Sequence, residues 1–418
     1  MRIVAAISSV VCALIVASCV SELTPVDMPV IDYAAELAGT EPLTNGAQPT
    51  ILAGVYIVDV GRGRLGDTVA IRFDGRRLGL YAERNVTFVG GAAAAQGDSA
   101  IIIGAWRAIT NQDAGRLDLV ARASEGGREL TQGKGNGKGL ILRGAVRIGS
   151  RTEPIVLRKL GAIKARLRGF QIIAHRGGGR NSERLGRSEN SIPMMMLASS
   201  LGATGIEIDI HSTKDGVPIV FHDATFTART VPSPYMIGNV DNYTLSQLRI
   251  AARLVNGEQI PTLREALTAV IDSTDLSLIW LDNKAAGVVD SILRIQREMI
   301  DYGARKGRKI RILFGIPTDD ILRAYEDSPL NGTVPVLCEL APETALRIKA
   351  EVWAPRFTLG TQAAVVSDLQ RQGCDVYVWT LDDVAFIRRY LAEDTFDGIL
   401  TNYPTLLAWG FYIRQIER

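Results

Sequence analysis

The spacing of hydrophobic residues divides the chain into three regions of different character. The segment Ile3–Val16 is almost wholly apolar. From about residue 50 to residue 158, short apolar and β-branched runs are separated by glycine-rich turns. Beyond residue 170, apolar runs of strand length alternate with amphipathic stretches. Since period-two runs indicate strands and a 3.6-residue period indicates helices, we expect an apolar leader, an all-β region and an α/β region.

The middle region, residues 50–158, predicts a small all-β domain. Its apolar runs, such as Val55–Val60 and Thr68–Phe73, are short, and no long helical period interrupts them. Short strands joined by glycine turns are typical of an antiparallel barrel or sandwich. Residues 20–49 suit a tether because they are rich in Pro, Thr, Glu and Gly, and the basic segment 159–169 suits a linker. We expect this domain to be separable from the rest of the chain.

The last region, residues 170–418, predicts a TIM barrel. Its apolar runs and amphipathic stretches make eight alternating β and α units over about 250 residues. That number and length favour a closed barrel over an open doubly wound sheet. The strand candidates are Phe170–Ala174, Ala203–Ile210, Leu276–Leu281, Lys309–Phe314, Thr333–Leu337, Glu351–Ala354, Asp375–Thr380 and Asp397–Leu400.

Residues 1–19 have the order of an export signal. Arg2 supplies a positive charge, the apolar run follows, and the small residues Val16, Ala17 and Ser18 precede Cys19. This order resembles the bacterial lipoprotein box, in which the signal is cut before a cysteine that then carries lipid. We therefore expect export across the inner membrane and a lipid anchor on Cys19, in the outer membrane or at the surface of a bacterial cell. A plain signal peptide with an incidental cysteine, or a transmembrane anchor, are the alternatives.

Composition and charge narrow the functional class. Hydrophobic residues make up 47% and charged residues 22% of the 418-residue chain, which is ordinary for a soluble globular protein. A formal net charge of +2 argues against a nucleic-acid partner. Beyond the signal and the anchor the chain has two cysteines, Cys338 and Cys374, and the sequence leaves open whether they pair. It has only three histidines, His175, His211 and His222, so their positions are informative.

Three carboxylates are expected to meet at one rim of the predicted barrel. Active sites of TIM barrels lie at the carboxyl ends of the strands. Glu207 and Asp209 alternate along the second predicted strand and therefore share one face, and Asp282 stands at the end of the third. Charged side chains inside a barrel are costly unless they are paired or bind a metal. Because carboxylate oxygens suit Mg²⁺ or Ca²⁺, we expect a divalent-cation site.

Histidines and basic side chains follow the ends of neighbouring strands. His175 and Arg176 follow the first strand, and His222 ends a short return after the second. Two histidines can act as a general acid and base at neutral pH. Arg176 and Lys284 offer positive charge to a phosphate, and Trp379 is expected to line the substrate pocket or pack in the core. With the carboxylates, these residues predict metal-assisted hydrolysis of a phosphodiester.

A series of motifs runs from His175 to the end of the predicted barrel. The motifs are His175-Arg176-Gly177, Glu189-Asn190-Ser191, Gly205–Asp209, Lys214–Asp223, Ile260–Leu267, Val378–Thr380 and Asp397–Pro404. In this order they resemble the glycerophosphodiester phosphodiesterase family, whose barrel is related to those of phosphatidylinositol-specific phospholipase C and sphingomyelinase D. The resemblance implies a metal-dependent phosphoric diester hydrolase that acts on a small glycerophosphodiester or lysolipid and releases an alcohol and glycerol 3-phosphate.

The resemblance also implies a role for each candidate site residue. By this resemblance the catalytic pair is His175 and His222, the ligands of Mg²⁺ or Ca²⁺ are Glu207, Asp209 and Asp282, and the substrate contacts are Arg176 and Lys284. Trp379 joins the substrate contacts as a pocket residue. These assignments agree with the chemistry inferred from the residues themselves.

Several positions depart from the family pattern. Ser188 stands where the family has proline, and Asp282 stands where most members have glutamate. His211 occupies a position often held by glutamine and is expected to be a supporting polar group. The loop after His175 is longer than usual and carries three arginines, Arg180, Arg184 and Arg187. These departures affect substrate identity more than the chemistry.

Two other functions stay open beside the leading one. The pair Asp282 and Lys284 is reminiscent of sphingomyelinase D, so phospholipase D-like cleavage of lysolipids or sphingolipids is an alternative. From a different class, the protein could be a surface ligand-binding lipoprotein with a degenerate barrel. The intact histidine pair and carboxylate trio argue against a degenerate barrel.

Overall fold

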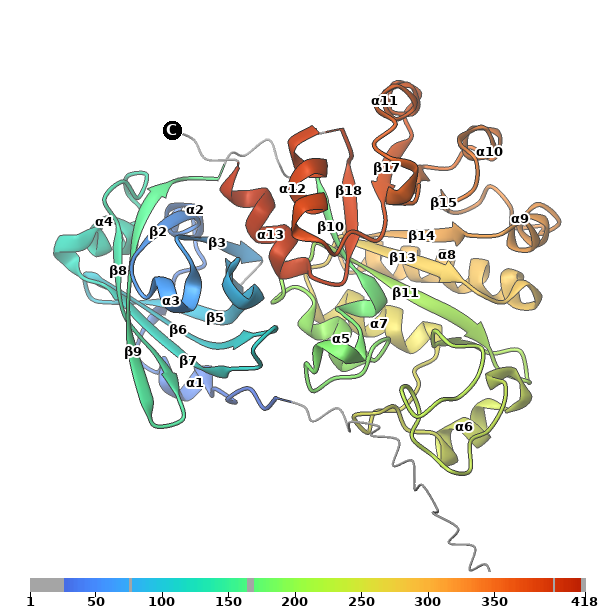
Figure 1. The fold of residues 1–418 in the computed structure, drawn as a ribbon, viewed down its shortest axis with the longest axis horizontal. Helices are drawn as coiled ribbons and strands as arrows, with labels where there is room; N and C mark the ends of the chain where they lie inside the picture. Colours follow the sequence, from blue (N-terminus) through green and yellow to red (C-terminus); the bar gives the residue numbers. More distant parts are fainter. Residues whose placement is uncertain (1–25, 75–76, 164–168, 394, 415–418) are drawn as a thin grey trace, which may run out of the picture.

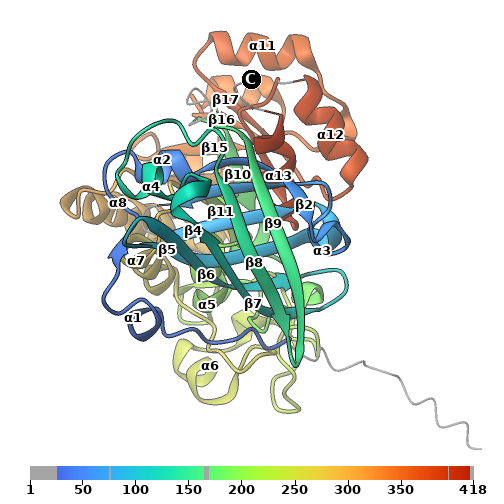
Figure 2. The ribbon, with the colours of Figure 1, turned by 90° about the vertical axis from the view of Figure 1, so that its left-hand side faces the viewer.

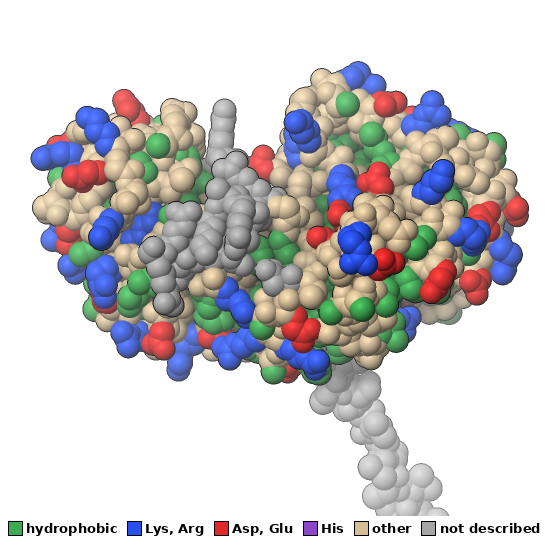
Figure 3. Space-filling model, turned by 90° about the horizontal axis from the view of Figure 1, so that it is seen from above, with side chains coloured by type: hydrophobic (Ala, Val, Ile, Leu, Met, Phe, Trp, Pro, Cys, Tyr) green, Lys and Arg blue, Asp and Glu red, His purple; other side chains and the backbone are tan. Residues whose placement is uncertain are grey.

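The computed structural model describes residues 26–74, 77–163, 169–393 and 395–414. The expected signal peptide and Cys19 lie outside these residues. Two barrels lie side by side, an all-β barrel formed by the first part of the chain and an α/β barrel formed by the second (Figure 1). Acidic and basic side chains intermingle over both barrels on the face drawn in Figure 3.

The first barrel is antiparallel. Within the described residues its sheet closes through eight strands in the order β5-β4-β3-β2-β9-β8-β7-β6, because β6 also pairs with β5. Figure 2 looks onto this barrel with β8 and β9 in front. The sequence left a barrel and a sandwich open. Because the sheet closes on itself, the domain is a barrel. The strands are β2 (Gly54–Val60), β3 (Thr68–Asp74), β4 (Arg77–Ala82), β5 (Thr87–Gln96), β6 (Ser99–Ala108), β7 (Ala114–Ala121), β8 (Ile141–Ile148) and β9 (Arg151–Gly161), with the short β1 (Glu41–Pro42) added to β5.

The interior of the first barrel is apolar. Alternate residues of each strand point inward, so large side chains such as Tyr56, Leu80, Trp106 and Leu157 are buried in one cluster. Short helices interrupt the strands: α1 (Tyr33–Glu36), α2 (Gln48–Leu52), α3 (Arg62–Leu65) and α4 (Gly127–Thr131). The core is filled by side chains, which leaves the site to the second barrel.

The second barrel has the expected parallel architecture. Each of the eight apolar runs singled out in the sequence contains a strand, and within the described residues the eight strands close because β10 pairs with both β18 and β11. The strands are β10 (Gln171–Ala174), β11 (Gly205–Ser212), β13 (Leu278–Asn283), β14 (Arg311–Ile316), β15 (Val336–Cys338), β16 (Val352–Trp353), β17 (Asp375–Val378) and β18 (Gly398–Thr401). The short β12 (Pro218–Val220) runs antiparallel to β11 and leads to His222.

Helices surround the parallel barrel. They are α5 (Ile192–Leu197), α7 (Leu263–Ser273), α8 (Val289–Arg305), α9 (Asp319–Glu326), α10 (Pro342–Arg347), α11 (Ala363–Arg371), α12 (Val384–Glu393) and α13 (Pro404–Ile413), and α6 (Leu245–Ala251) lies in the insertion after β12. Helices α7, α8, α9, α11 and α12 are amphipathic, and α7 begins with a capping box of Thr262 and Glu265. In the described part of the chain, no helix is long and apolar enough to cross a bilayer.

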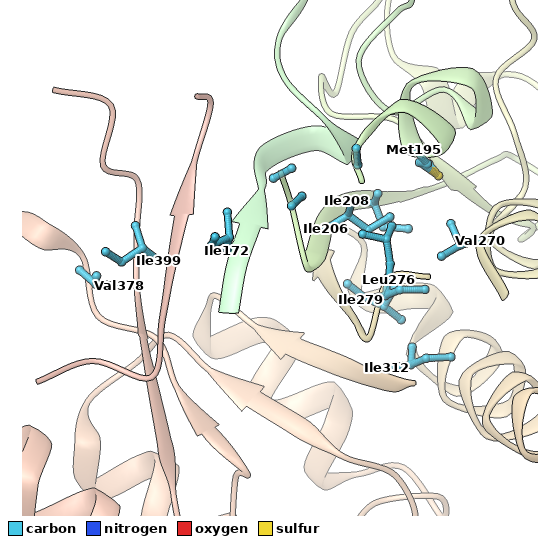
Figure 4. Packing of buried hydrophobic residues seen from close by; sticks show 14 of the residues in the cluster. Ile172, Met195, Ile206, Ile208, Val270, Leu276, Ile279, Ile312, Val378 and Ile399 are labelled. Carbon is cyan, nitrogen blue, oxygen red and sulfur yellow. The ribbon is translucent and has the colours of Figure 1, made fainter. Parts of the chain in front are cut away.

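The alternation of residues along β11 positions the site. Ile206, Ile208 and Ile210 point outward and pack in the core between the strands and the helices (Figure 4). Glu207 and Asp209, which alternate with them, point into the barrel and are almost completely buried. The same period that builds the core therefore places two carboxylates inside the barrel.

The two barrels share a large apolar interface. Helix α13 lies between them (Figure 1), and every residue from Pro404 to Tyr412 is buried. The ring of Tyr81 from β4 stacks with Tyr412, and the indole NH of Trp409 donates to the carbonyl of Thr68 on β3. A helix that is apolar on all sides is stable in water only when other elements bury all of its sides. The interface thus argues against the expectation that the β domain is separable.

The two cysteines of the described region are free thiols. Cys338 ends β15 and Cys374 precedes β17, and both are buried in the core around the barrel. Burial raises the pKa of each thiol to about 11, so both are protonated at neutral pH. The disulfide that the sequence left open is absent from the structure.

Candidate active site

A cavity of about 500 Å³ opens at the carboxyl ends of the parallel strands. It is the position at which TIM barrels carry their active sites. All eight candidate site residues line it: His175, Arg176, Glu207, Asp209, His222, Asp282, Lys284 and Trp379. Residues that the sequence did not single out complete the wall, among them Glu339 and Arg356.

Glu207, Asp209 and Asp282 form a compact group of carboxylates. One oxygen from each lies within 4.8 Å of the others. The Oε1 atom of Glu207 and the Oδ1 atom of Asp282 are buried and have no hydrogen-bond partner among the described residues. Buried carboxylate oxygens without partners are costly, and a divalent cation is the ligand that would satisfy them. These residues therefore fit a Mg²⁺ or Ca²⁺ site.

Burial and mutual repulsion within this group change the pKa values of its carboxylates. Burial raises the pKa of Glu207 well above its usual range, and the neighbouring Asp209 and Asp282 raise it further. Burial also raises the pKa of Asp282, although Lys284 opposes the change. Positive charge placed among the three carboxylates would reverse both shifts, because it favours the ionised forms.

Lys284 supplies part of that positive charge. Its ammonium group contacts a carboxylate oxygen of Asp282 and lies 3.2 Å from Oδ1 of Asp209. Burial alone would lower the pKa of Lys284, but Asp282 and Asp209 raise it above its usual range. Asn190 holds the other side of Asp209, since its amide nitrogen donates to Oδ2 at 2.8 Å.

Glu339 is a fourth acidic residue in the cavity, and sequence reasoning missed it. It directly follows β15, and its Oε1 atom is buried without a hydrogen-bond partner among the described residues. Burial and the nearby Asp282 raise its pKa well above the usual range. Its position just after a barrel strand was the signal available in the sequence.

Hydrogen bonds determine which nitrogen of His175 carries the proton. Asp382 accepts from the backbone and side-chain nitrogens of Asn402, at 2.8 and 2.5 Å. The amide oxygen of Asn402 consequently faces Nδ1 of His175, at 2.8 Å. An oxygen can only accept, so Nδ1 donates and Nε2 keeps its lone pair. Burial lowers the pKa of His175 to about 4, so the ring is neutral at neutral pH.

His222 has an acidic partner instead. Its Nδ1 atom lies 2.7 Å from a carboxylate oxygen of Asp223, and Arg229 holds both oxygens of that carboxylate at 2.8 Å. On the other side of the ring, Nη2 of Arg176 lies 2.8 Å from Nε2. The fixed carboxylate therefore orients the imidazole ring of His222 through Nδ1.

Arg176 connects the histidine to the loop that follows β10. Its Nη1 atom donates to Glu189 at 2.9 Å, and its backbone NH donates to Oε2 of Glu207 at 2.8 Å. Its φ of 54° is unusual for a residue other than glycine and aims this NH into the site. The guanidinium therefore stands between His222 and the loop, where it can reach an anion in the cavity.

The other residues that depart from the family pattern take supporting positions. Nε2 of His211 donates to the backbone carbonyl of His222 at 3.2 Å and so helps hold the segment that carries His222. Ser188 is buried and bonds to both carboxylate oxygens of Glu258, at 2.9 and 2.6 Å, through its backbone NH and its hydroxyl group. None of the three loop arginines, Arg180, Arg184 and Arg187, lines the cavity in the described part of the chain.

Trp379 forms the wall opposite the carboxylates on the β17 side. Its indole NH donates to the carbonyl of Ala354 at 2.8 Å, which fixes the ring. The guanidinium of Arg356 stacks over that ring, 4.8 Å from its centre. The ring is thus both a packing residue of the barrel interior and part of the pocket wall.

Comparison with known proteins places this geometry in a family. A model described as the glycerophosphoryl diester phosphodiesterase family matches residues 175–406, which is more than half of the chain. The chain belongs to this family. The match to the glycerophosphoryl diester phosphodiesterase family begins at His175 and includes every residue proposed for the site. The expected resemblance and the expected TIM barrel are therefore confirmed.

Individual relatives differ in how much they share. Rat glycerophosphodiester phosphodiesterase 1 is 38% identical over 125 residues, which are 28% of this chain and 35% of that protein, so the match spans about a third of its length. The glycerophosphodiester phosphodiesterase of Caldanaerobacter subterraneus is 27% identical over 249 residues, which are 56% of this chain and 95% of that protein.

Comparison with solved structures also gives matches at low sequence identity. A glycerophosphodiester phosphodiesterase from Parabacteroides distasonis superposes with a TM-score of 0.48 at 23% identity, covering 59% of this chain and 98% of that chain. A phosphodiesterase from Oleispira antarctica, solved in complex with the product sn-glycerol-3-phosphate, has a TM-score of 0.46 at 20% identity, covering 57% of this chain and 96% of that chain.

Proposed function

We propose that this protein hydrolyses glycerophosphodiesters to an alcohol and glycerol 3-phosphate, with His175 as general base and His222 as general acid. The observation that carries the proposal is one cavity that holds a carboxylate trio, two differently supported histidines and two basic side chains. Two histidines with different hydrogen-bond partners, an amide oxygen for His175 and a carboxylate for His222, are suited to different roles. Membership of the family supports the same reaction.

His175 is suited to accept a proton. Because the Nδ1–H group donates a hydrogen bond to the amide oxygen of Asn402, the lone pair lies on Nε2 and is free to abstract a proton from the nucleophile. A ring that is neutral at neutral pH is in the protonation state that a base requires. The nucleophile that this base deprotonates can be a water molecule or the neighbouring hydroxyl group of glycerol.

His222 is suited to donate a proton to the departing alkoxide. Asp223, held by Arg229, accepts a hydrogen bond from Nδ1 and so orients the ring. Arg176 would turn from Nε2 of His222 to a phosphate oxygen when substrate binds, which frees Nε2 for the leaving group. Lys284 adds positive charge on the carboxylate side of the same phosphate.

A divalent cation, Mg²⁺ or Ca²⁺, fits Glu207, Asp209 and Asp282, and when bound it would polarise the phosphoryl oxygens and stabilise the charge that grows on them. Neighbouring groups of the chain orient two of these carboxylates. Asn190 orients Asp209, and the backbone NH of Arg176 orients Glu207. Supporting contacts of this kind fix the direction of the ligand oxygens.

The test of the proposed reaction is an assay on a panel of glycerophosphodiesters with different head groups, with and without added Mg²⁺ or Ca²⁺. We expect release of glycerol 3-phosphate that stops when a chelator removes the cation. Failure to turn over any member of the panel in either metal would overturn the proposal.

Phospholipase D-like cleavage of lysolipids is the second candidate. The contact of Lys284 with Asp282 motivates it, because Asp282 stands where most members of the family have glutamate and the pair is reminiscent of sphingomyelinase D. Choline-containing substrates distinguish the two activities. Choline released from a long-chain lysolipid but not from glycerophosphocholine would favour the second candidate.

Replacement of Asp282 by alanine should weaken the cation site without removing the acid and base. We expect the metal concentration for half-maximal activity to rise by at least about tenfold, the loss typical even for changes outside the ligand shell. Excess Mg²⁺ or Ca²⁺ should restore part of kcat. Asp282→Glu, which keeps a carboxylate, is the matched control and should need less added metal. Loss of kcat that no metal concentration improves would contradict the ligand role.

We also propose that the protein is exported and anchored through lipid on Cys19. Val26, the first described residue, donates its backbone NH to the carbonyl of Arg184 in the loop that follows β10. Six residues lie between Cys19 and Val26, and the seven Cα–Cα steps that join the two span at most about 25 Å. A lipid on Cys19 would therefore hold the loop side of the active site close to the bilayer.

Cys19→Ala should release the protein from the membrane fraction into the soluble periplasm or the medium. The physical reason is that the described helices offer no alternative span. The measurement is fractionation with mass spectrometry of the mature amino terminus. A wild-type protein that is already soluble and carries no lipid would refute the anchor.

A further inference from the structure

A fully buried arginine links the first barrel to the active-site loop of the second. Arg107 lies near the end of β6 and has no exposed surface. We infer that Arg107 is a positioning residue for the phosphate-binding guanidinium of Arg176, so that the β domain completes the active site. The inference rests on the proposed contact between Arg176 and the substrate phosphate.

The first step runs from Arg107 to a turn in the loop. Its Nη2 atom donates to the backbone carbonyls of Glu183 and Arg184, at 3.0 and 2.8 Å, and its Nη1 atom donates to the carbonyl of Ala108 at 3.1 Å. The first two acceptors belong to the end of a short 3-10 helix, Asn181–Glu183, which lies in the loop that is longer than usual. The first barrel thus holds this turn from outside the parallel barrel.

The second step runs from the turn to Glu189. Asn181, the first residue of the turn, accepts from the backbone NH of Glu189 through its side-chain oxygen, at 2.9 Å. Its own backbone NH lies 3.3 Å from Oε2 of Glu189, to which it donates. Both residues are buried. The position of the turn therefore sets the position of the Glu189 carboxylate.

The third step reaches the site. Glu189 accepts from Nη1 of Arg176 through Oε1, at 2.9 Å, and from Nη1 of Arg229 through Oε2, at 2.7 Å. The other end of the Arg176 guanidinium lies beside His222. Glu189 is consequently the carboxylate that aims Arg176 into the cavity.

The chemistry of Arg107 indicates more than interface packing. Within the described residues no carboxylate accepts a hydrogen bond from it, and its Nε atom has no partner. Burial lowers its pKa to about 10, so it is still charged at neutral pH. A buried charge without an ion pair is costly, and an apolar residue of similar size would pack at lower cost. Its retention is explained if the three carbonyls need to be held in place.

The experiment compares Arg107→Met in two backgrounds, the wild-type sequence and Arg176→Ala. The methionine keeps an unbranched, flexible stem and removes both the charge and the donors. The readouts are the Kd of inorganic phosphate for the full-length, Mg²⁺-loaded protein and kcat/KM on a glycerophosphodiester. Trp409→Phe, which removes an interface hydrogen bond far along the sequence from the loop, is the matched control.

We expect Arg107→Met to weaken phosphate binding by about tenfold in the wild-type background and by less than about twofold in the Arg176→Ala background, since coupled residues are not additive. Trp409→Phe should leave the Kd unchanged. Arg107→Lys, which keeps one donor group, should give a smaller loss and replaces methionine if that variant does not fold.

Equal losses in both backgrounds, or a loss in Trp409→Phe as large as in Arg107→Met, would overturn the inference, because a merely structural role predicts them. Absence of phosphate binding in the wild-type protein would overturn it as well. Coupling in the phosphate Kd together with no turnover on the panel would leave the inference standing and refute the proposed function alone.

Discussion

Replacing His175 or His222 by alanine is expected to reduce kcat on glycerophosphocholine by about 10²-fold to 10⁴-fold in each case, the usual contribution of a general acid or base. The double variant should lose little more than the worse single variant, because the two rings act as a unit. Added Mg²⁺ or Ca²⁺ should restore neither variant, which distinguishes them from Asp282→Ala. The measurement is kcat across a metal titration.

His211→Gln is the matched control for the histidine variants. Its amide nitrogen can still donate to the backbone carbonyl of His222, so we expect only a small loss of kcat. Circular dichroism checks that the barrel is folded, since residues at this rim serve function more than stability. A near-normal kcat in either His175→Ala or His222→Ala would rule out the proposed proton-transfer pair.

Removal of the first barrel is expected to have the second large effect, a loss of the folded state. A chain of residues 170–418 would expose the face of α13 that packs on Tyr81 and Phe88, with Trp409 and Tyr412 among the uncovered side chains. Burial of each large apolar side chain is worth roughly 1.5–3 kcal/mol. Several such losses approach the total stability of about 5–15 kcal/mol that is typical of a domain.

Size-exclusion chromatography and near-ultraviolet circular dichroism test this expectation. We expect aggregation, or a species without fixed tertiary packing, from the truncated chain, whereas residues 26–418 should remain a folded, active protein. A well-folded truncated barrel with the kcat/KM of the longer chain would contradict both the structural role of the interface and the positioning role of Arg107.

The alternation of strands and helices was readable because it is a local property. Each strand of the parallel barrel buries a short apolar run, and each longer helix repeats its apolar face every 3.6 residues. In the first barrel β4 and β9 are harder to recognise from the sequence. Glycine interrupts β4, and in β9 polar and charged residues flank a short apolar run, Ile155–Leu157.

The candidate site was readable for a related reason. Residues at the ends of parallel strands lie at one rim of a barrel. The sequence alone therefore groups four residues that line the cavity, His175, Glu207, Asp209 and Asp282. Glu339 obeys the same rule and was overlooked because no motif surrounds it. The partners that set proton positions, Asn402 and Asp382, could not be paired with His175, since only closure of the barrel between β10 and β18 brings these distant segments together.

The sequence by itself thus determined the parallel barrel and the residues that meet at its rim, because these depend on periodicity and on residue type, and the export signal stays a prediction. Only the tertiary structure decided that the antiparallel sheet closes, that Cys338 and Cys374 stay unpaired, and that helix α13 packs between the two barrels. It also decided that Arg107, an ordinary polar residue in a strand sequence, meets the active-site loop. The physical reason is that such contacts join residues far apart in the chain, whose encounter depends on how the whole molecule packs.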